Sequence, residues 1–223
     1  MKTCVVIPTY NEEKEIGGLT LGIKAQGLSV VVVDDGSNDS TVRIAEELGA
    51  VVLRNMKNHG KGASLIKGFN YALTHGFDAV VTMDGDGQHL PSDLPSFLGA
   101  ARQTDTGVFI GNRMHRPKNM PLHRLIINGM MSWFVSGIIR QNVPDSQCGF
   151  RLIKCDVLKK INLITSNYEI ETEILIKTAA VGLKIESVPI NTVYSGEKSR
   201  INPFIDTLRF LRYIVRELWT LKS

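Results

Sequence analysis

The sequence has few aromatic residues, only three cysteines and no long apolar run. Aromatic side chains are 7% of its 223 residues, whereas 43% of the residues are hydrophobic and 22% are charged. This is an ordinary globular composition, which excludes a disordered, collagen-like or disulfide-scaffold protein. Cys4, Cys148 and Cys155 lack paired spacing, so we expect buried free thiols in a reducing compartment rather than a zinc site.

No segment is long and apolar enough to predict a membrane-spanning helix. The longest uncharged stretch, Leu125–Ile139, is shorter than the roughly 20 residues that a spanning helix needs. The apolar residues at the start of the chain stop at Pro8, which is too soon for a signal peptide. We therefore expect a cytoplasmic protein.

Positive charge is concentrated in two late segments of the chain, whose formal net charge is +4. One segment holds Arg113, Arg116, Lys118 and Arg124 without an acidic residue, and the other lies between residues 195 and 223. Such segments predict an anionic ligand or surface. Neither matches a known nucleic-acid-binding motif, so we expect no nucleic-acid partner.

Apolar runs and helix-forming segments alternate through the first half of the chain. The short apolar runs predict strands at residues 3–7, 28–33, 50–54, 79–83 and 107–111. The segments between them predict helices at residues 11–26, 40–48, 62–75 and 91–103. This alternation predicts an α/β fold, with a mainly parallel central sheet flanked by helices. We expect one domain over residues 1–202, followed by an amphipathic helix at 203–223.

Two carboxylates follow the predicted strand at residues 79–83. Asp84 and Asp86 are one residue apart, and Gln88 and His89 come soon after them. Carboxylate oxygens suit Mg²⁺ or Mn²⁺, which also bind substrate phosphates. The pattern therefore predicts a divalent metal site, with Gln88 or His89 adding a ligand or an outer contact. An ordinary turn rich in Asp and Gly is the alternative.

Three further polar loops have patterns that suit a nucleotide. Asp34 and Asp35 can bond to a base and to ribose hydroxyls, while Tyr10 can stack on a base and Glu12 can bind a sugar hydroxyl. Lys61 lies between two glycines that would let the backbone approach a diphosphate, although the spacing is not that of a Walker loop. Each loop alone also fits a turn before a helix. Ligands of parallel sheets bind outside the carboxyl ends of the strands, so we expect these loops on one edge.

Taken together, the four motifs resemble those of family 2 glycosyltransferases with the glycosyltransferase A fold. The resemblance spans residues 1–111 and rests on VVIPTYNEE, VVVDDGSNDST, NHGKGASLIKG and MDGDGQH. It implies inverting transfer from a nucleotide-diphosphate sugar. It also implies a donor-binding set made of Pro8, Tyr10, Asn11, Glu12, Asp34, Asp35, Lys61 and Asp84. Asp84, Asp86 and Gln88 would hold Mg²⁺ or Mn²⁺ on the diphosphate.

The later part of the chain resembles the group of dolichol-phosphate mannose synthases and polyprenyl-phosphate glycosyltransferases. The resemblance rests on GNR at 111–113, Arg124 with Asn128, DSQCGFR at 145–151, Glu173 and VPI at 188–190. It implies that Arg113 and Arg124 bind the acceptor phosphate. The group usually has a further arginine where Ser195 stands here, and Lys198 or Arg200 would supply that cation. This departure leaves the sugar and the acceptor open.

We therefore expect an enzyme that transfers a sugar from a GDP-mannose- or UDP-glucose-type donor to polyprenyl or dolichyl phosphate. It would be peripheral on the cytoplasmic membrane face. The residues expected to carry the reaction are Asp84, Asp86, Arg113, Arg124, Asp145 and Arg200. The alternative is transfer to a sugar hydroxyl of a glycan or lipid-linked acceptor, with Asp145 or Glu173 as the base. A nucleotide-sugar-binding protein without turnover is a third hypothesis, and the sequence predicts no oligomeric state.

Two apolar segments each have two interpretations. The stretch Leu125–Ile139, with Trp133 and Phe134, either borders a lipid chain or forms a buried helix. The helix expected at 203–223 has an apolar stripe beside a basic stripe, which suits an anionic lipid surface or packing on its own domain. The apolar stripe is Leu208, Leu211, Val215 and Leu218, and the basic stripe is Arg209, Arg212 and Arg216.

Overall fold

Seven strands form one sheet in the computed structural model, which describes residues 1–115, 117, 120–192, 209–210 and 212–217. The strands are β1 (Thr3–Thr9), β2 (Ser29–Asp34), β3 (Val51–Arg54), β4 (Ala79–Thr82), β5 (Val108–Asn112), β6 (Arg151–Lys154) and β7 (Ile185–Pro189). The α-helices are α1 (Ile16–Ala25), α2 (Thr41–Glu47), α3 (Lys61–Thr74), α4 (Leu94–Gln103), α5 (Leu122–Ile139), α6 (Cys155–Leu158) and α7 (Ile170–Ala180). Short 3₁₀ turns, η1 (Pro91–Asp93) and η2 (Arg113–His115), precede α4 and follow β5.

The sheet has the order β3-β2-β1-β4-β6-β5-β7 and is mainly parallel. β1 runs parallel to β2 and β4, and β5 runs parallel to β7. β6 is antiparallel to both of its neighbours, β4 and β5. The mainly parallel α/β fold expected from the sequence is therefore confirmed, and β6 is an antiparallel insertion that the alternation of segments did not predict.

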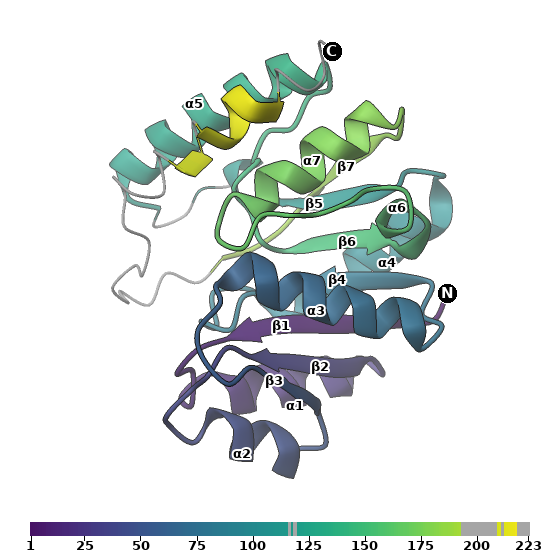
Figure 1. Cartoon of the computed structure of the whole chain (residues 1–223). Helices are drawn as coiled ribbons and strands as arrows, with labels where there is room; N and C mark the ends of the chain where they lie inside the picture. Colours follow the sequence, from purple (N-terminus) through teal and green to yellow (C-terminus); the bar gives the residue numbers. More distant parts are fainter. Residues whose placement is uncertain (116, 118–119, 193–208, 211, 218–223) are drawn as a thin grey trace.

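Helices cover both faces of the sheet. α3 and α7 lie over one face, and α1 and α4 lie over the other (Figure 1). Cys4–Ile7 and Val30–Val33 are buried throughout, because strands covered on both sides need apolar residues at every position. The three cysteines are free and buried, as expected.

The first helix begins later than the sequence predicts. The expected start was residue 11, but α1 begins at Ile16. Asn11 has a positive φ of 54° and bonds to the next loop: its N–H donates to Ser37 Oγ at 2.8 Å, and its Oδ1 accepts from Asn38 N at 2.9 Å. Contacts between loops, which local propensity does not contain, therefore hold residues 11–15 out of the helix.

The helical residues near the carboxyl terminus, 209–210 and 212–217, pack beside α5 and are called the C-terminal helix below. Phe210, Tyr213 and Ile214 are buried, and the ring centroids of Phe210 and Phe134 are 6.3 Å apart. Arg209, Arg212 and Arg216 are exposed, as is Val215. The described residues of this helix thus pack on the domain, and Val215, the one described residue of the predicted apolar stripe, is not among the packed ones.

Several predictions fall on parts of the chain that are not described. Leu208, Leu211 and Leu218, the boundary at residue 202, and the substituted segment Ser195–Arg200 lie outside the described residues. In the described part, no helix is both long enough and apolar enough to cross a bilayer.

Candidate active site

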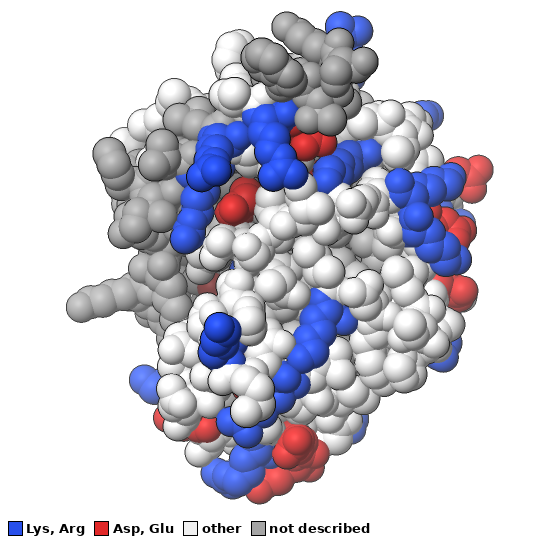
Figure 2. Space-filling view, viewed as in Figure 1, with Lys and Arg blue, Asp and Glu red and all other residues white. Residues whose placement is uncertain are grey.

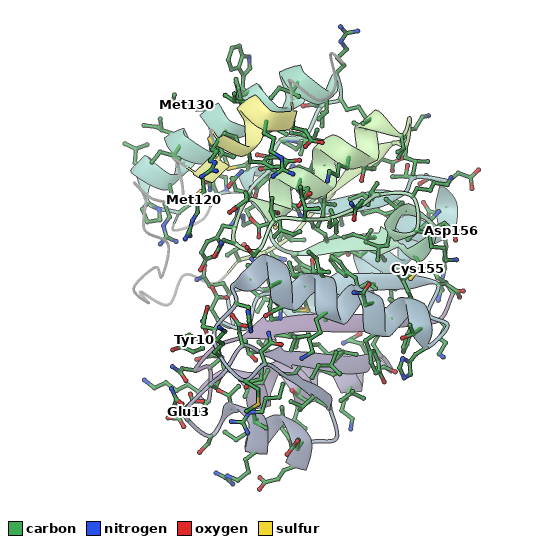
Figure 3. All side chains as sticks on the ribbon, in the orientation of Figure 1. Tyr10, Glu13, Met120, Met130, Cys155 and Asp156 are labelled. Carbon is green, nitrogen blue, oxygen red and sulfur yellow. The ribbon has the colours of Figure 1, made fainter. Side chains whose placement is uncertain are left out.

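The polar loops after β1, β2 and β4 meet at the carboxyl ends of these three strands, which is one edge of the sheet. Asp35 N donates to Thr9 O at 2.8 Å, which joins the loops after β2 and β1. The loop after β4 packs on the same place, since a Cβ added to Gly85 would lie 3.2 Å from Glu12 Cγ. Tyr10 and Glu13 lie at this edge, and Cys155 lies at the opposite end of the sheet (Figure 3). The predicted convergence of these motifs is therefore correct.

Asp84 is held by a lysine that in turn contacts a second carboxylate. Lys61 Nζ lies 2.5 Å from Asp84 Oδ1 and 2.6 Å from Glu171 Oε1. Burial tends to raise the pKa of Asp84, but the Lys61 ammonium outweighs burial and lowers that pKa to about 2. Burial tends to lower the pKa of Lys61, but Asp84 and Glu171 outweigh it and raise that pKa. Asp84 and Lys61 therefore both carry a full charge at neutral pH.

His89 fixes the start of the same loop. The backbone N–H of Asp84 donates to His89 Nδ1 at 3.1 Å, so Nδ1 carries no proton. Burial lowers the pKa of His89 to about 4, so the ring is neutral at pH 7 with its proton on Nε2. Nε2 lies 4.0 Å from Asp84 Oδ2. His89 thus orients the loop, and its Nδ1 is already engaged.

Asp86 and Gln88 are joined by two hydrogen bonds. Asp86 Oδ1 accepts from Gln88 N at 3.1 Å, and Asp86 Oδ2 accepts from Gln88 Nε2 at 2.8 Å. Gly87 between them has a φ of 71°, and a Cβ there would lie 2.5 Å from Glu15 Oε2. The turn therefore favours glycine for its backbone conformation, because a residue with a Cβ is strained at this φ.

The donor chemistry of this loop fits a magnesium or manganese ion that substrate phosphates help to bind. Asp84 and Asp86 offer carboxylate oxygens and Gln88 offers an amide oxygen, all hard ligands. Among the described residues, no group of three or more His, Cys, Asp and Glu side chains converges into a metal cage. Mg²⁺ commonly binds one or two carboxylates together with phosphates and water, so two carboxylates are sufficient for such a site.

Asp34 and Asp35, expected to bind the nucleoside, are buried; Asp34 bonds within its own loop, and Asp35 bonds to the segment before α3. Asp34 Oδ1 accepts from Ser37 N at 3.2 Å. Asp35 accepts from His59 N at 3.0 Å, from Gly60 N at 2.8 Å and from Asn55 Nδ2 at 2.8 Å. Asp35 therefore ties the loop before α3 to the end of β2, and nucleoside contact by either carboxylate stays a prediction.

The glycines beside Lys61 have a structural reason that the sequence did not indicate. A Cβ at Gly62 would lie 2.5 Å from Thr165 O, and one at Gly60 would collide with Ser166 O. Ala63 N also donates to Ser166 O at 3.2 Å. Close packing on residues 165–167 therefore requires glycine at these two positions, and approach of a diphosphate to this loop stays a prediction.

Arg113 and Asp145 form a bidentate ion pair at the end of β5. Arg113 Nε lies 2.7 Å from Asp145 Oδ2, and Nη2 lies 2.8 Å from Oδ1. The Asp145 carboxylate is fully buried, whereas the Arg113 side chain is 14% exposed. Asp145 thus sets the orientation of the guanidinium. Arg124 is partly exposed in the first turn of α5, and Arg200 lies outside the described residues.

The segment 145–151 lies beside the carboxyl end of β4, where Gly149 packs against Thr82 and Asp84. Thr82 Oγ1 donates to Gly149 O at 2.6 Å, and a Cβ on Gly149 would lie 2.6 Å from Asp84 Oδ2. Arg151 is fully buried and donates to Ser146 O and Cys148 O, each at 2.8 Å. This buried cation shapes the turn that packs against Asp84.

Glu171 was not among the predicted site residues. Glu173 was predicted as a candidate base, but its carboxylate oxygens already accept hydrogen bonds within the protein. Glu171 contacts Lys61, a pairing between residues 110 positions apart that no local pattern signals. Glu173 is fully buried and accepts from Ile164 N at 3.0 Å, from Thr165 N at 2.8 Å and from Lys177 Nζ at 2.6 Å. Glu173 therefore holds the segment before α7.

Comparisons with known proteins identify a family and several relatives of this chain. A family model described as glycosyl transferase family 2 matches residues 4–162. The chain is 34% identical over 207 residues to the undecaprenyl-phosphate mannosyltransferase of Micrococcus luteus, covering 86% of this chain and 84% of that one. It is 31% identical over 214 residues to the UDP-N-acetylglucosamine–dolichyl-phosphate N-acetylglucosaminyltransferase of Methanococcus voltae, covering 86% and 85%.

A solved structure shares the fold at lower identity. The glucosyl-3-phosphoglycerate synthase of Mycobacterium tuberculosis, solved with Mn²⁺, UDP-glucose and phosphoglyceric acid, superposes with a TM-score of 0.75. The two chains are 20% identical, and the match covers 99% of this chain and 79% of that one. This likeness confirms the glycosyltransferase A fold that the motifs led us to expect. The family match and the two relatives show that this chain belongs to glycosyltransferase family 2.

Proposed function

We propose that the enzyme transfers a sugar from a nucleotide-diphosphate sugar to a polyprenyl or dolichyl phosphate. The observation that carries this proposal is the similarity, over 86% of the chain, to relatives named for undecaprenyl phosphate and dolichyl phosphate. The two relatives are named for different sugars. The proposal therefore covers both a GDP-mannose-type and a UDP-glucose-type donor. The proposed location is peripheral, on the cytoplasmic face of a membrane.

The proposed donor site is formed by the loops after β1, β2 and β4, which lie together at the carboxyl ends of these strands. Pro8, Tyr10, Asn11, Glu12, Asp34, Asp35 and Lys61 are the proposed donor-binding residues. Asp84, Asp86 and Gln88 would hold Mg²⁺ or Mn²⁺, which supplies positive charge for the departing nucleoside diphosphate. The ion pair to Lys61 keeps Asp84 charged and in one place. The related structures with Mn²⁺ or Mg²⁺ and UDP support a divalent metal.

On the acceptor side, a phosphate needs no strong base. Its second pKa is about 6, so it is largely ionised at neutral pH. Arg113, Arg124 and Arg200 are the proposed phosphate contacts, and Asp145 holds the guanidinium of Arg113 in place. An acceptor oxygen bonds to the anomeric carbon while the bond to the diphosphate breaks, and the configuration inverts. Positioning of the acceptor is then the main contribution of these cations.

Transfer to a sugar hydroxyl is less well supported by the geometry. A hydroxyl must lose its proton to a base during transfer. The two candidate carboxylates are fully buried: Asp145 is bidentate with Arg113, and Glu173 accepts from two backbone N–H groups and Lys177. Neither is placed to take a proton from an acceptor.

An acceptor panel tests the proposal. The full chain is incubated with Mn²⁺ and labelled GDP-mannose, UDP-glucose or UDP-N-acetylglucosamine, together with a polyprenyl phosphate, the matching polyprenol or a free glycan. We expect label in the polyprenyl phosphate with one donor and none in the polyprenol. Label in a glycan or polyprenol alone would replace the proposal by the hydroxyl alternative. Donor binding without any transfer would favour a binding protein.

A further inference from the structure

We propose that Lys61 is an exchangeable counter-ion of Asp84, and that Glu171 is the positioning residue that keeps Lys61 when a divalent cation binds to Asp84. The inference rests on the metal site in the proposed function, but not on the identity of the donor or the acceptor. It gives Glu171, which no motif indicated, a role that acts through Lys61. Together the two residues would set how tightly the loop after β4 binds a metal ion.

The ammonium group of Lys61 competes with a metal ion for Asp84. Lys61 Nζ lies 2.5 Å from Asp84 Oδ1, which makes a close ion pair. A Mg²⁺ ion at its usual distance of about 2.1 Å from the same oxygen would lie within about 5 Å of that nitrogen. Like charges at this separation repel each other, and solvent screens them only in part, because both side chains are mostly buried. Lys61 and the ion therefore compete for one carboxylate.

The second oxygen of Asp84 does not relieve this competition. A Cβ added to Gly149 would lie 2.6 Å from Oδ2 and 2.8 Å from Oδ1, so the backbone at Gly149 packs closely on the carboxylate. His89 Nε2 lies 4.0 Å from Oδ2, and the N–H of Asp84 donates to Nδ1 of the same ring. The carboxylate is thus confined by its neighbours. Lys61 has a flexible four-carbon side chain, so it is the group that can move.

Lys61 has a second binding place on the segment that leads into α7. Its Nζ lies 2.6 Å from Glu171 Oε1 and 5.8 Å from the centroid of the Tyr168 ring. A carboxylate and an aromatic face both attract an ammonium group. Glu171 is itself held in place, because the fully buried guanidinium of Arg151 donates to its backbone carbonyl. Lys61 can therefore leave Asp84 and still keep an ion pair.

The geometry separates Glu171 from the candidate metal ligands. Within the part of the chain that the structure describes, Glu171 does not join Asp84 and Asp86 in a group of acidic side chains that could hold a metal ion. The Glu171 oxygen nearest to Asp84 is instead bonded to Lys61. Removing the Glu171 carboxylate should therefore affect metal binding mainly while Lys61 is present.

A second lysine on α3 provides a matched control for the loss of one positive charge. Lys and Arg side chains are spread over the face of the molecule that Figure 2 shows, so a change of net charge alone can be tested away from the site. Lys67 lies further along α3 and donates to Arg54 O and Asn55 Oδ1, each at 2.8 Å. These acceptors are carbonyl and amide oxygens rather than carboxylates, so Lys67→Met removes charge without freeing a metal ligand.

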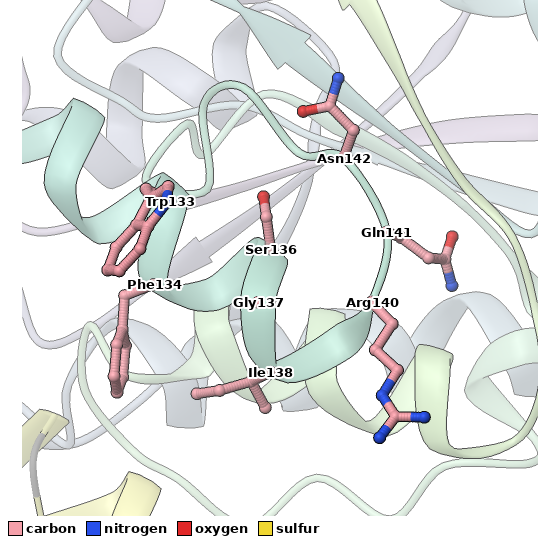
Figure 4. Close-up of a pocket in the computed structure, with 8 residues that line it drawn as sticks. All are labelled: Trp133, Phe134, Ser136, Gly137, Ile138, Arg140, Gln141 and Asn142. Carbon is pink, nitrogen blue, oxygen red and sulfur yellow. The ribbon is translucent and has the colours of Figure 1, made fainter.

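A hollow at the end of α5 is not a competing place for a metal ion. It has a volume of about 620 Å³ and is lined by Arg140 and by uncharged residues (Figure 4). A guanidinium without a carboxylate beside it repels a divalent cation. Asp86→Asn provides the positive assignment, because it removes a carboxylate from the loop after β4 and should reduce any Mn²⁺ signal that comes from that loop.

The test measures the affinity of Mn²⁺ alone, without nucleotide, for the full chain. The parent chain, Lys61→Met, Glu171→Gln and the double variant form a thermodynamic cycle, with Lys67→Met and Asp86→Asn as controls. Calorimetry and the electron paramagnetic resonance signal of free Mn²⁺ measure binding, and thermal melting establishes that each protein is folded. If Lys61→Met does not melt cooperatively, Lys61→Gln replaces it throughout the cycle, because its amide still donates a hydrogen bond.

We expect Lys61→Met to bind Mn²⁺ about tenfold or more tightly than the parent chain, because the competing ammonium group is gone. Glu171→Gln should bind Mn²⁺ about three- to tenfold more weakly, because Lys61 then has Asp84 as its only carboxylate partner. In the Lys61→Met background, Glu171→Gln should change the affinity by less than about threefold, because the two residues act as a pair. Lys67→Met should bind like the parent chain.

An unchanged Mn²⁺ affinity in Lys61→Met or in Glu171→Gln would overturn the proposal. An equal loss from Glu171→Gln with and without Lys61 would also overturn it, because Glu171 would then act on the metal ion directly. Undiminished binding by Asp86→Asn would place the ion elsewhere and refute the metal site on which the inference rests. The expected cycle without transfer to any lipid phosphate would leave the exchange intact and refute only the proposed reaction.

Discussion

Lys61 Nζ lies 2.6 Å from Glu171 Oε1, although 110 positions separate the two residues in the chain. The same nitrogen lies 2.5 Å from Asp84 Oδ1. One ammonium group therefore connects the first turn of α3, the start of α7 and the loop that carries the candidate metal ligands. The packing of α7 on α3 is in this way coupled to the position of a carboxylate in the candidate active site.

Lys61→Met should destabilise the metal-free protein by about 3–5 kcal/mol, because it leaves two mostly buried carboxylates without their cation. Adding Glu171→Gln should cost less than the sum of the two single changes, because the pair no longer exists to be broken. Urea unfolding of the four proteins measures this cycle. The exposed pair Lys159–Asp156 is the control, and its removal should leave the unfolding midpoint nearly unchanged, because solvent screens an exposed pair. Additive effects at Lys61 and Glu171 would contradict the coupling.

Asp86→Asn should abolish sugar transfer and most metal-dependent binding of the donor. The amide keeps the shape of the side chain but removes a negative charge from the candidate metal site. Calorimetry with nucleoside diphosphates, with and without Mn²⁺, measures the binding. Asp105→Asn, at an exposed position away from the site, is the matched control. A variant with normal transfer at limiting metal would remove Asp86 from the metal ligands.

Arg124→Ala should raise the KM for the lipid phosphate by about ten- to a hundredfold and leave the donor KM nearly unchanged. A charge-assisted hydrogen bond to phosphate contributes about 1.5–3 kcal/mol, which gives that range. Steady-state kinetics with each substrate varied in turn separates the two effects. Arg102→Ala, an exposed arginine on α4, serves as the control. A defect confined to the donor would move Arg124 to the diphosphate side.

Deleting residues 203–223 should lower the melting temperature. The C-terminal helix buries Phe210, Tyr213 and Ile214 against the domain, so the deletion exposes the apolar surface that they cover. Replacing Arg209, Arg212 and Arg216 with glutamine removes charge but little packing, so that triple variant should melt near the parent chain. Equal melting of the truncated and parent chains would show that the helix contributes no packing free energy.

The three cysteines should resist alkylation in the folded protein. Burial raises the pKa of Cys4 and of Cys148 to about 12 and also raises the pKa of Cys155. The reactive thiolate is therefore scarce at pH 8 in all three, and at Cys4 and Cys148 it becomes abundant only near pH 12. Thiol titration should find almost no fast-reacting group in buffer and all three in urea. A fast-reacting native thiol would contradict this burial.

The sequence alone was sufficient to predict the fold class and the convergence of the polar loops after β1, β2 and β4. Valine-rich runs such as Ser29–Asp34 define strands buried on both faces, because only apolar side chains tolerate that position. The Asp and Gly residues that interrupt these runs mark the carboxyl ends of the strands, and a parallel sheet brings those ends together. These inferences need only local pattern and a general rule of topology.

Tertiary structure decided the partners of the charged groups and the faces of the late helices. Nothing local indicates that Lys61 meets Glu171, that Asp145 is bidentate with Arg113, or that Glu173 is occupied by backbone N–H groups. α5 is apolar on both its inward and outward sides, so its periodicity did not distinguish the buried side from the exposed side. In the C-terminal helix, the packed side chains Phe210 and Ile214 lie beside the stripe that the sequence indicated. Long-range packing chooses these contacts, because ion pairs and buried faces depend on which elements become neighbours in space.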